Sequence, residues 1–285
     1  MNIFAENKEF WEKAIVSRRS VRSYKREPLS SEIMEKLRVF VSAHEIPFSD
    51  LVRIVFFKTR KNHPLANNLK KPPEDAVAFI TDTSSIVNVT AAGFAGQIVL
   101  LYAQGLGISN CWFGHYILEE IERLVPGIDP VQGADKPRFG YGKGNVDGFH
   151  AVCVSPLGYF EPGGTRIVDR ITSNVISFKR KPIDDLLEDN IREGSLPKSL
   201  KTAFDMARKA PSAANTQHWR YSVSHDNKTI EIKKLKGFTH FRWEHAEMDV
   251  GICAAHFYIG LAMQNMDFEI KQISENDGII WRFTV

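Results

Sequence analysis

Two long apolar segments, one in each half of the chain, constrain its fold more than any other feature of the sequence. The first runs from Ala91 to Ile108 and the second from Val250 to Met266. In the first segment Ala95, Ile98 and Tyr102 recur at helical spacing, which predicts a helix and not a strand. A pair of apolar helices is what two packed halves would supply to a shared core.

The first apolar segment is about the minimum length for a membrane span. Gln97, Gln104 and several glycines interrupt it, so we predict a helix buried in protein and no membrane partner. The N-terminal residues Met1–Lys8 include acidic and amide side chains where a signal peptide requires an apolar segment. The sequence therefore predicts a cytoplasmic protein.

Composition excludes several classes of function. With 43% hydrophobic and 25% charged residues among 285, the chain can bury a sizeable core and hold one large or two small domains. The net charge of +3 is too small, and the basic residues are too scattered, to indicate a nucleic-acid partner. The widely separated cysteines form no CxxC pair, which argues against a disulfide framework or a zinc site and fits a reducing cytosol: Cys111, Cys153 and Cys253.

The order of the predicted elements repeats along the chain. The first half contains helices over 10–17 and 31–44, strands over 52–57 and 76–81, the apolar helix ending near 105, and a strand over 150–154. The second half contains a helix over 198–209, strands over 219–224 and 229–235, the second apolar helix, and strands over 268–273 and 279–285. We predict an α+β protein with antiparallel-rich sheets and an internal duplication, divided into residues 1–178 and 179–285.

Two short polar motifs lie far apart in the chain. The first is RRSVR at Arg18–Arg22, and a doubled arginine is usually a solvated surface feature. The second is APSAANTQHW at Ala210–Trp219, where the proline, serine and asparagine residues also fit a helix end followed by a turn. Neither motif decides a function by itself.

Taken together, the two motifs resemble those of the FMN-dependent nitroreductase family. The first is similar to its RRSxR phosphate-binding opening. The second is similar to its APSxxNxQPW segment, which in that family covers the FMN of the partner subunit. Because both lie on one chain here, the resemblance is to the single-chain branch called putative TM nitroreductase. It implies a nitroreductase-like fold in which the chain has absorbed its dimer partner and forms a pseudo-dimer.

The resemblance also implies which residues hold the cofactor. The phosphate of FMN carries nearly two negative charges and binds best to guanidinium groups and oriented backbone donors. The first motif and a tail resembling the family's RxP ending supply such groups: Arg18, Arg19, Ser20, Arg22 and Arg180. The second motif is expected to cover the flavin through Pro211, Ser212, Ala213, Asn215 and Gln217. His218 stands where the family has proline, which leaves the backbone there less constrained.

A third segment, GLGISNCWFG at Gly105–Gly114, is similar to the family's GLGxxCWxG. Its glycines also fit an ordinary helix C-cap. The resemblance implies that backbone N–H groups after this turn reach the reactive edge of the flavin, and Gly114 would permit that approach. The residues expected at this edge are Trp112, Phe113, Gly114 and His115.

The two halves differ in what they retain of these motifs. The first half has Ile46–Asp50 where the second has Ala210–Asn215, and the second begins with Lys179–Ile183 and has no RRS. One site should therefore be complete and its pseudo-symmetric counterpart lost. We predict one FMN per chain.

The expected activity is hydride transfer from NAD(P)H through FMN to an electron-poor small molecule such as a nitroaromatic or a quinone, in a ping-pong cycle. Arg18 is the best candidate for stabilising the anionic reduced flavin, and no catalytic side chain is required. His240 and His245 lack the spacing of metal ligands, and the glycine-rich stretch 139–144 lacks the context of a phosphate loop.

Two alternatives stay open from the sequence. The protein could bind flavin without turnover, as a store or sensor, or it could be a scaffold that has lost the cofactor. The choice between NADH and NADPH, and between a monomer and further association, is also open.

Overall fold

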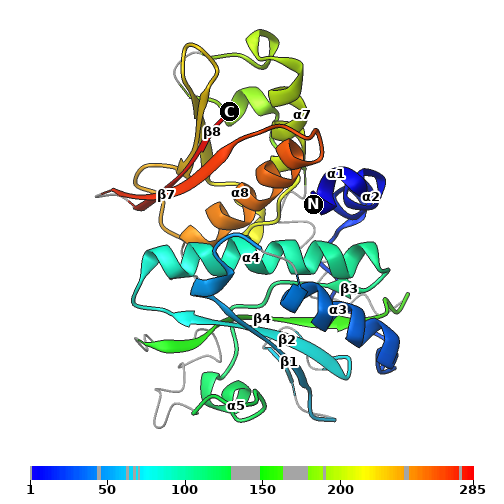
Figure 1. Cartoon of the computed structure of the whole chain (residues 1–285). Helices are drawn as coiled ribbons and strands as arrows, with labels where there is room; N and C mark the ends of the chain where they lie inside the picture. The colour runs from blue at the N-terminus through cyan, green and yellow to red at the C-terminus, as the bar shows by residue number, and fades with distance from the viewer. Residues whose placement is uncertain are drawn as a thin grey trace.

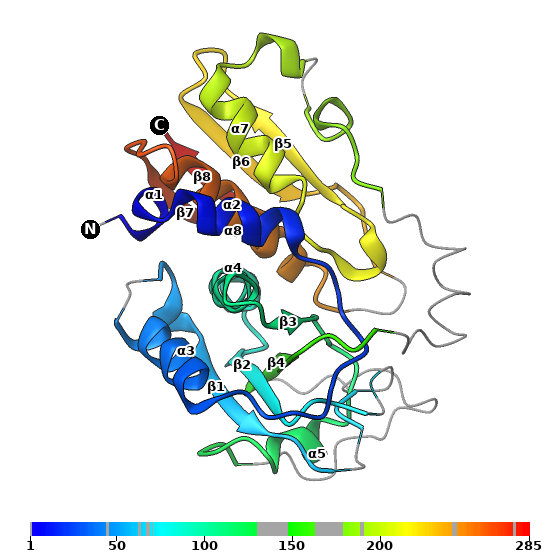
Figure 2. The same cartoon turned by 90° about the vertical axis from the view of Figure 1, so that its right-hand side faces the viewer.

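The structure is a computed structural model that describes residues 2–43, 46–61, 64–66, 69, 71–129, 148–162, 179–188, 191–240, 244–275 and 278–285. Two antiparallel four-stranded sheets are present (Figures 1 and 2). The first has the order β1-β2-β4-β3 and consists of β1 (Arg53–Lys58), β2 (Asp75–Asp82), β3 (Ser109–Asn110) and β4 (Phe149–Gly158). The second has the order β5-β6-β8-β7 and consists of β5 (Trp219–Val223), β6 (Thr229–Lys234), β7 (Glu269–Glu275) and β8 (Gly278–Thr284).

The two sheets repeat one topology. In each, the first two strands form a hairpin, a long helix follows, and the third strand lies at the edge beside the fourth. The long helices are α4 (Ile86–Gly105) and α8 (Glu247–Ala262), and the helices that precede each sheet are α3 (Ser31–Ala43) and α7 (Lys198–Ala207). This repetition confirms the predicted α+β fold with an internal duplication.

Helices α4 and α8 pack against each other between the two sheets (Figure 1). Their backbones approach closely because a glycine from each helix lies at the crossing. A Cβ on Gly251 would lie 1.9 Å from the carbonyl oxygen of Thr90, and one on Gly93 would lie 2.2 Å from that of Met248. Both distances are far below van der Waals contact, so the crossing requires glycine.

Helix α4 satisfies the length and composition of a membrane span among the described residues, with a mean hydropathy of 1.6 over its most apolar window. Yet 78% of that window is buried inside the protein. Its apolar character is explained by contacts on all sides with α8, α2 and the first sheet.

The N-terminal helices α1 (Ile3–Glu6) and α2 (Lys8–Ser17) connect the two halves. Phe4 packs on Tyr258 of α8 at a ring separation of 5.5 Å, whereas Trp11 packs on Phe40 of α3 at 6.0 Å. After α2 the chain runs in extended form along the first half (Figure 2). The N–H of Val21 donates to the Asn110 carbonyl at 3.2 Å in this stretch. The motif that begins at Arg18 is thereby placed where the halves meet.

Some elements escaped the sequence analysis because they are shorter than the windows in which periodicity is detected. They are α1, β3, α5 (Leu118–Glu122) and the 3₁₀ turns η1 (Ser49–Leu51), η2 (Ile183–Asp185), η3 (Glu193–Ser195) and η4 (Ala213–Asn215). The domain boundary at 178 stays a prediction, because 163–178 lie outside the described residues, as does the glycine-rich stretch 139–144.

Candidate functional site

Arg18 carries a buried positive charge that nothing in the described chain neutralises. It is the C-cap of α2, where its N–H donates to the Ala14 carbonyl at 3.0 Å. Its side chain is 8% exposed, and its Nε and Nη1 atoms have no hydrogen-bond partner. Because a buried charge without a partner is costly, an anion is the expected complement of this guanidinium.

Two further arginines, Arg22 and Arg180, act on the charge of Arg18. Burial, and to a smaller extent the charges of Arg180 and Arg22, lower the pKa of Arg18 to about 10, while Cys111 and Tyr24 oppose the shift. At neutral pH the guanidinium is still protonated. The arginines of the N-terminal motif and of the tail at Arg180, far apart in sequence, therefore contribute to one region of positive charge.

The other residues of the first motif have different environments. The guanidinium of Arg19 is exposed and lies over the ring of Phe160, 4.6 Å from its centroid. Ser20 forms a parallel bridge with Asn110 of β3. Arg22 is half-buried. Within this motif the buried charge belongs to Arg18, and sequence alone did not separate it from Arg19.

The tail containing Arg180 is bound along the second motif. Arg180 Nη1 donates to Asn215 Oδ1, and Asn215 Nδ2 donates to the Lys179 carbonyl at 3.2 Å. The N–H of Lys181 donates to Gln217 Oε1 at 2.8 Å. Two predicted covering residues, Asn215 and Gln217, thus bring the tail and the turn together.

The turn of the second motif has an unusual backbone. Ala214, Asn215 and Gln217 have φ values of 49°, 55° and 48°, a left-handed region that non-glycine residues seldom adopt. Two hydrogen bonds stabilise the turn, one from within it and one from α8. Ser212 Oγ accepts from the N–H of Gln217 at 3.0 Å, and a buried carboxylate, Asp249 Oδ2, accepts from the N–H of Ala213 at 2.8 Å. Pro211, which begins the motif, is buried.

His218, where the family pattern has proline, closes this turn as a neutral ring. Burial lowers its pKa to about 4. Its Nε2 lies 2.8 Å from the Ala246 carbonyl and its Nδ1 2.8 Å from Thr216 Oγ1. Since a carbonyl only accepts, Nε2 carries the proton and donates to it. The ring also stacks on Phe238 at 4.2 Å, so packing replaces the constraint of a proline.

The third predicted segment is anchored by hydrogen bonds just before Gly114. Trp112 Nε1 donates to Gln97 Oε1 at 2.8 Å. The N–H of Phe113 donates to the Val154 carbonyl at 2.9 Å, and the Val154 N–H donates back at 3.0 Å. The amide of Phe113 is therefore committed to the sheet. Gly114 and His115, which follow, are both half-buried.

A buried network that the sequence analysis missed links this segment to the second half. Gln97 accepts from Trp112 through Oε1, so its Nε2 donates to His256 Nε2 at 2.9 Å. His256 must then carry its proton on Nδ1, which donates to the Met206 carbonyl at 3.1 Å. Burial, followed by the nearby charge of Arg18, lowers the pKa of His256 well below its ordinary value. The sequence signal that could have revealed this network is a polar residue in each apolar helix, Gln97 in the first and His256 in the second.

In the first half, the turn that corresponds to the second motif packs against aromatic rings. Phe48, also left-handed with a φ of 62°, places its ring 5.6 Å from Phe94 and 5.0 Å from Trp281. Ile46 is buried, and Asp50 is exposed. This turn has no asparagine or serine in the positions that Asn215 and Ser212 occupy in the second half.

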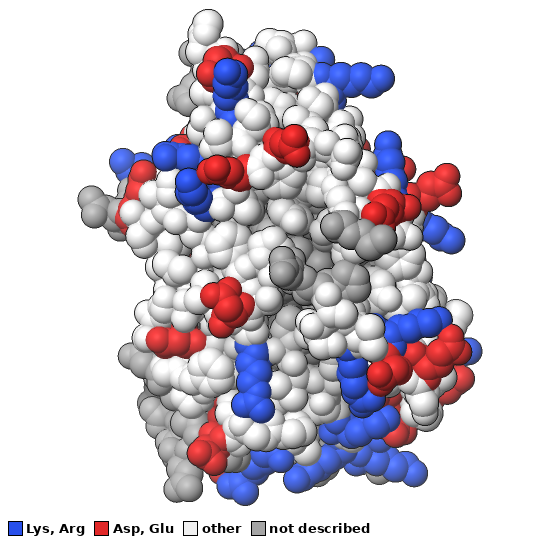
Figure 3. Space-filling model, viewed as in Figure 1, with Lys and Arg blue, Asp and Glu red and all other residues white. Residues whose placement is uncertain are grey.

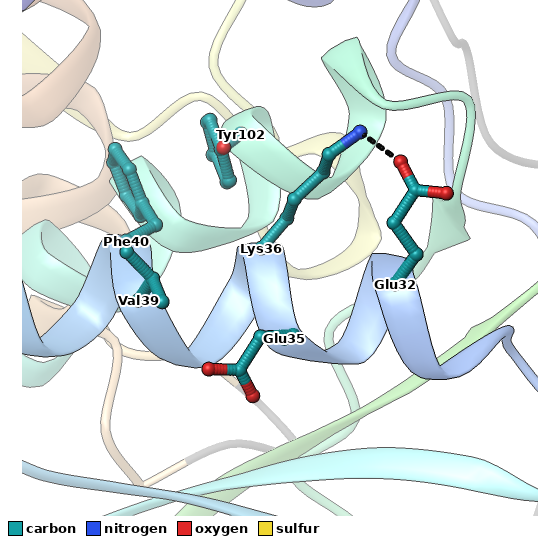
Figure 4. A pocket seen from close by; sticks show the side chains of 6 residues that line it. All are labelled: Glu32, Glu35, Lys36, Val39, Phe40 and Tyr102. Carbon is teal, nitrogen blue, oxygen red and sulfur yellow. Dashed lines mark hydrogen bonds and ion pairs between the residues drawn. The ribbon is translucent and has the colours of Figure 1, made fainter.

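A surface groove of about 310 Å³ lies elsewhere, between α3 and α4 (Figure 4). Phe40 and Tyr102 face each other there, with ring centroids 3.9 Å apart, and Lys36 points toward Glu32. Its lining contains none of the residues predicted to hold a cofactor. We therefore place the candidate site at the arginines and not at this groove.

The described residues contain no grouped metal ligands that would give a competing site. On the face in Figure 3, acidic and basic side chains occur on both halves, and basic side chains are most frequent along the lower edge. Among the described residues, no three His, Cys, Asp or Glu side chains are grouped so that they could hold a metal ion.

Comparison with known families adds to this geometry. A family model described as "Putative TM nitroreductase" matches residues 11–125 and 139–261. The matched ranges include Arg18, the Trp112 segment, Arg180 and the covering turn. No curated protein matches the chain.

Solved structures of similar fold are known. A putative nitroreductase from Thermotoga maritima is similar over 96% of this chain and 93% of its own, with 17% identity and a TM-score of 0.60. An FMN-dependent nitroreductase from Clostridium difficile R20291 is similar over 60% of this chain and 99% of its own, with 18% identity and a TM-score of 0.37. The Thermotoga similarity extends over both sheets and confirms the predicted nitroreductase-like fold.

Proposed function

This chain belongs to the family described as Putative TM nitroreductase, and on that premise we propose that it is an FMN-dependent oxidoreductase. That the chain is an oxidoreductase follows from the family, whose members are oxidoreductases. The FMN-dependent relative from Clostridium difficile supports the cofactor. The electron donor NAD(P)H, the electron-poor acceptor and the ping-pong order are part of the proposal.

The observation that carries the proposal is the buried guanidinium of Arg18. Its unpartnered Nε and Nη1 atoms, together with Arg180 nearby, fit an anionic group that enters between the halves. FMN supplies such a charge in its phosphate, and when bound it supplies the hydride-transfer chemistry. The chain's own residues would bind and orient it: Arg18, Arg19, Ser20, Arg22 and Arg180 on one side, Pro211, Ser212, Ala213, Asn215 and Gln217 on the other, and Trp112, Phe113, Gly114 and His115 at the edge.

The geometry modifies how these residues would act. Because Phe113 donates its amide to Val154, the first backbone N–H group of this segment that could donate to the flavin edge would be that of Gly114. Trp112 is held by Gln97 and would support the segment that forms this edge. Because His256 is neutral and already hydrogen-bonded on both nitrogens, we assign it no proton transfer.

The test is an absorbance spectrum of the purified protein, with a flavin-to-protein ratio, followed by steady-state oxidation of NADH and NADPH with nitrofurazone or menadione as acceptor. We expect bound FMN that either nucleotide reduces. A protein that binds FMN but is reduced by neither nucleotide would be a flavin store or sensor. A colourless protein that takes up no added FMN would be a scaffold without cofactor, and the proposal would be rejected.

We further propose that the protein acts on small molecules in the cytoplasm as a fused pseudo-dimer with one FMN per chain. The loss of the covering residues at the turn around Phe48 supports a single site.

A further inference from the structure

We infer that Asn215 acts on the cofactor through Arg180, which it holds in position, and not by contact with the flavin ring. The inference rests on the proposed FMN binding and deepens it. Resemblance to the family assigns Asn215 a covering contact, whereas the contacts of this chain assign it a positioning role.

The carboxamide of Asn215 is engaged at both ends by the tail of residues 179–181. Its Oδ1 accepts from Arg180 Nη1, and its Nδ2 donates to the Lys179 carbonyl at 3.2 Å. A guanidinium can only donate and a carbonyl can only accept, so these partners fix the orientation of the amide. The side chain is therefore directed at the tail.

The backbone on both sides of Arg180 is held by Gln217. Gln217 Oε1 accepts from the N–H of Lys181 at 2.8 Å, and its Nε2 donates to the Lys179 carbonyl at 3.0 Å. Lys181 Nζ also donates to the Thr216 carbonyl at 3.1 Å. With the main chain fixed by Gln217, the remaining freedom of Arg180 is in its side chain, and Asn215 restricts that.

The amide holds Arg180 without neutralising it. Burial lowers the pKa of Arg180, with a further decrease from the charge of Arg208, and no described carboxylate forms an ion pair with it. A carboxylate at this position would compete with an anionic ligand, because charge-assisted pairs with guanidinium are strong. A neutral acceptor instead leaves the charge of Arg180 available, beside Arg18, for the phosphate of FMN.

The variants must respect the backbone at this position. Asn215 has a φ of 55°, which glycine adopts without strain and alanine does not. Asn215→Gly therefore removes the amide without straining the backbone. Asn215→Asp keeps the shape but places a negative charge on Arg180. Asp50→Ala, in the corresponding turn of the first half, is the matched control.

The experiment measures the dissociation constants of FMN and riboflavin for apoprotein by quenching of flavin fluorescence, in wild type, Asn215→Gly, Asn215→Asp, Arg180→Met, the Gly/Met double variant and Asp50→Ala. Riboflavin lacks the phosphate. We expect Asn215→Gly, Asn215→Asp and Arg180→Met each to weaken FMN binding by about tenfold or more, with riboflavin binding unchanged. On the Arg180→Met background, Asn215→Gly should have no further effect on FMN, and Asp50→Ala should bind as wild type.

Two results would overturn the inference while leaving the proposed function intact. One is equal weakening of riboflavin and FMN by Asn215→Gly, which would indicate contact with the ring. The other is an additive loss of FMN affinity in the double variant. This second result is obtained from the FMN titrations without the riboflavin data. Wild-type protein that binds no FMN would reject both the inference and the proposed function.

Discussion

At the scale of single residues, Arg18 combines burial with an unsatisfied charge. Its side chain is 8% exposed, and two of its nitrogen atoms lack partners in the described chain. Such a group lowers the stability of the protein without its ligand and raises the affinity for an anion. Stability and binding should therefore change in opposite directions when this charge is removed.

Replacement Arg18→Met tests this opposition. Because methionine fills a similar volume without a charge, we expect the free energy of unfolding of the apoprotein to rise by roughly 1–4 kcal/mol. FMN binding should weaken by at least about tenfold. Urea unfolding and FMN titration measure the two effects. Arg38→Met, an exposed position on α3, serves as control and should change neither; a destabilised Arg18→Met apoprotein would show that the charge has a partner.

The buried carboxyl group of Asp249 should make the stability of the protein depend on pH. Burial raises its pKa from 3.8 to about 7, a shift that the Ala213 N–H opposes and Glu247 supports. The native state thus binds the proton more tightly than the unfolded chain. The stability from this group is complete below about pH 4 and is lost as the pH rises through about 7. His218, 3.9 Å away, is neutral over most of this range because burial lowers its pKa to about 4.

The variant Asp249→Asn isolates this titration, since its amide oxygen can still accept from Ala213. Relative to wild type, the variant should gain stability progressively from about pH 4 to pH 7, by roughly 1.4 kcal/mol for each unit of pKa shift, and no more above that range. Urea unfolding at several pH values measures the difference. Parallel profiles for the two proteins would contradict the raised pKa.

At the scale of elements, the crossing of α4 and α8 depends on backbone contact. A Cβ at Gly251 would lie 1.9 Å from the Thr90 carbonyl oxygen, and neither backbone can move without disturbing a sheet. Helix propensity alone favours alanine over glycine by about 0.5–1 kcal/mol. The steric effect should dominate, because it acts on main-chain atoms and not on a flexible side chain.

We expect Gly251→Ala to lower the free energy of unfolding by about 1–3 kcal/mol or more. The matched control is Gly194→Ala, because a Cβ at Gly194 meets no atom within 4 Å; its effect should stay within about 0.5 kcal/mol. Urea unfolding of both variants measures the difference. Equal stability of the two would mean that the helices can separate at this crossing without cost.

At the scale of the whole molecule, one topology occurs twice but only one half carries each part of the site. The first half and N-terminal helices provide Arg18, and the second half provides the turn that holds Arg180. The corresponding turn of the first half holds Phe48, which packs on Phe94 and Trp281. We propose that duplication followed by loss of one site produced this asymmetry.

We therefore expect about one FMN per chain, measured by absorbance against protein concentration. Asp50→Ala should leave the ratio unchanged, whereas Phe48 variants are poor controls because that ring packs between the halves. Light scattering with size-exclusion chromatography determines whether the pseudo-dimer is a monomer. A ratio near two would show that the turn around Phe48 also serves a flavin.

The sequence by itself determined the principal helices and strands, their repetition and the motifs at Arg18, Trp112 and Asn215. These follow from periodicity and turn chemistry, which operate over a few neighbouring residues. Only the tertiary structure decided which group in each motif is buried or already bonded: Arg18 and not Arg19, Asn215 bound to Arg180, and Gln97 joined to His256. Burial and hydrogen-bond partners come from segments distant in the chain, and no local pattern specifies them.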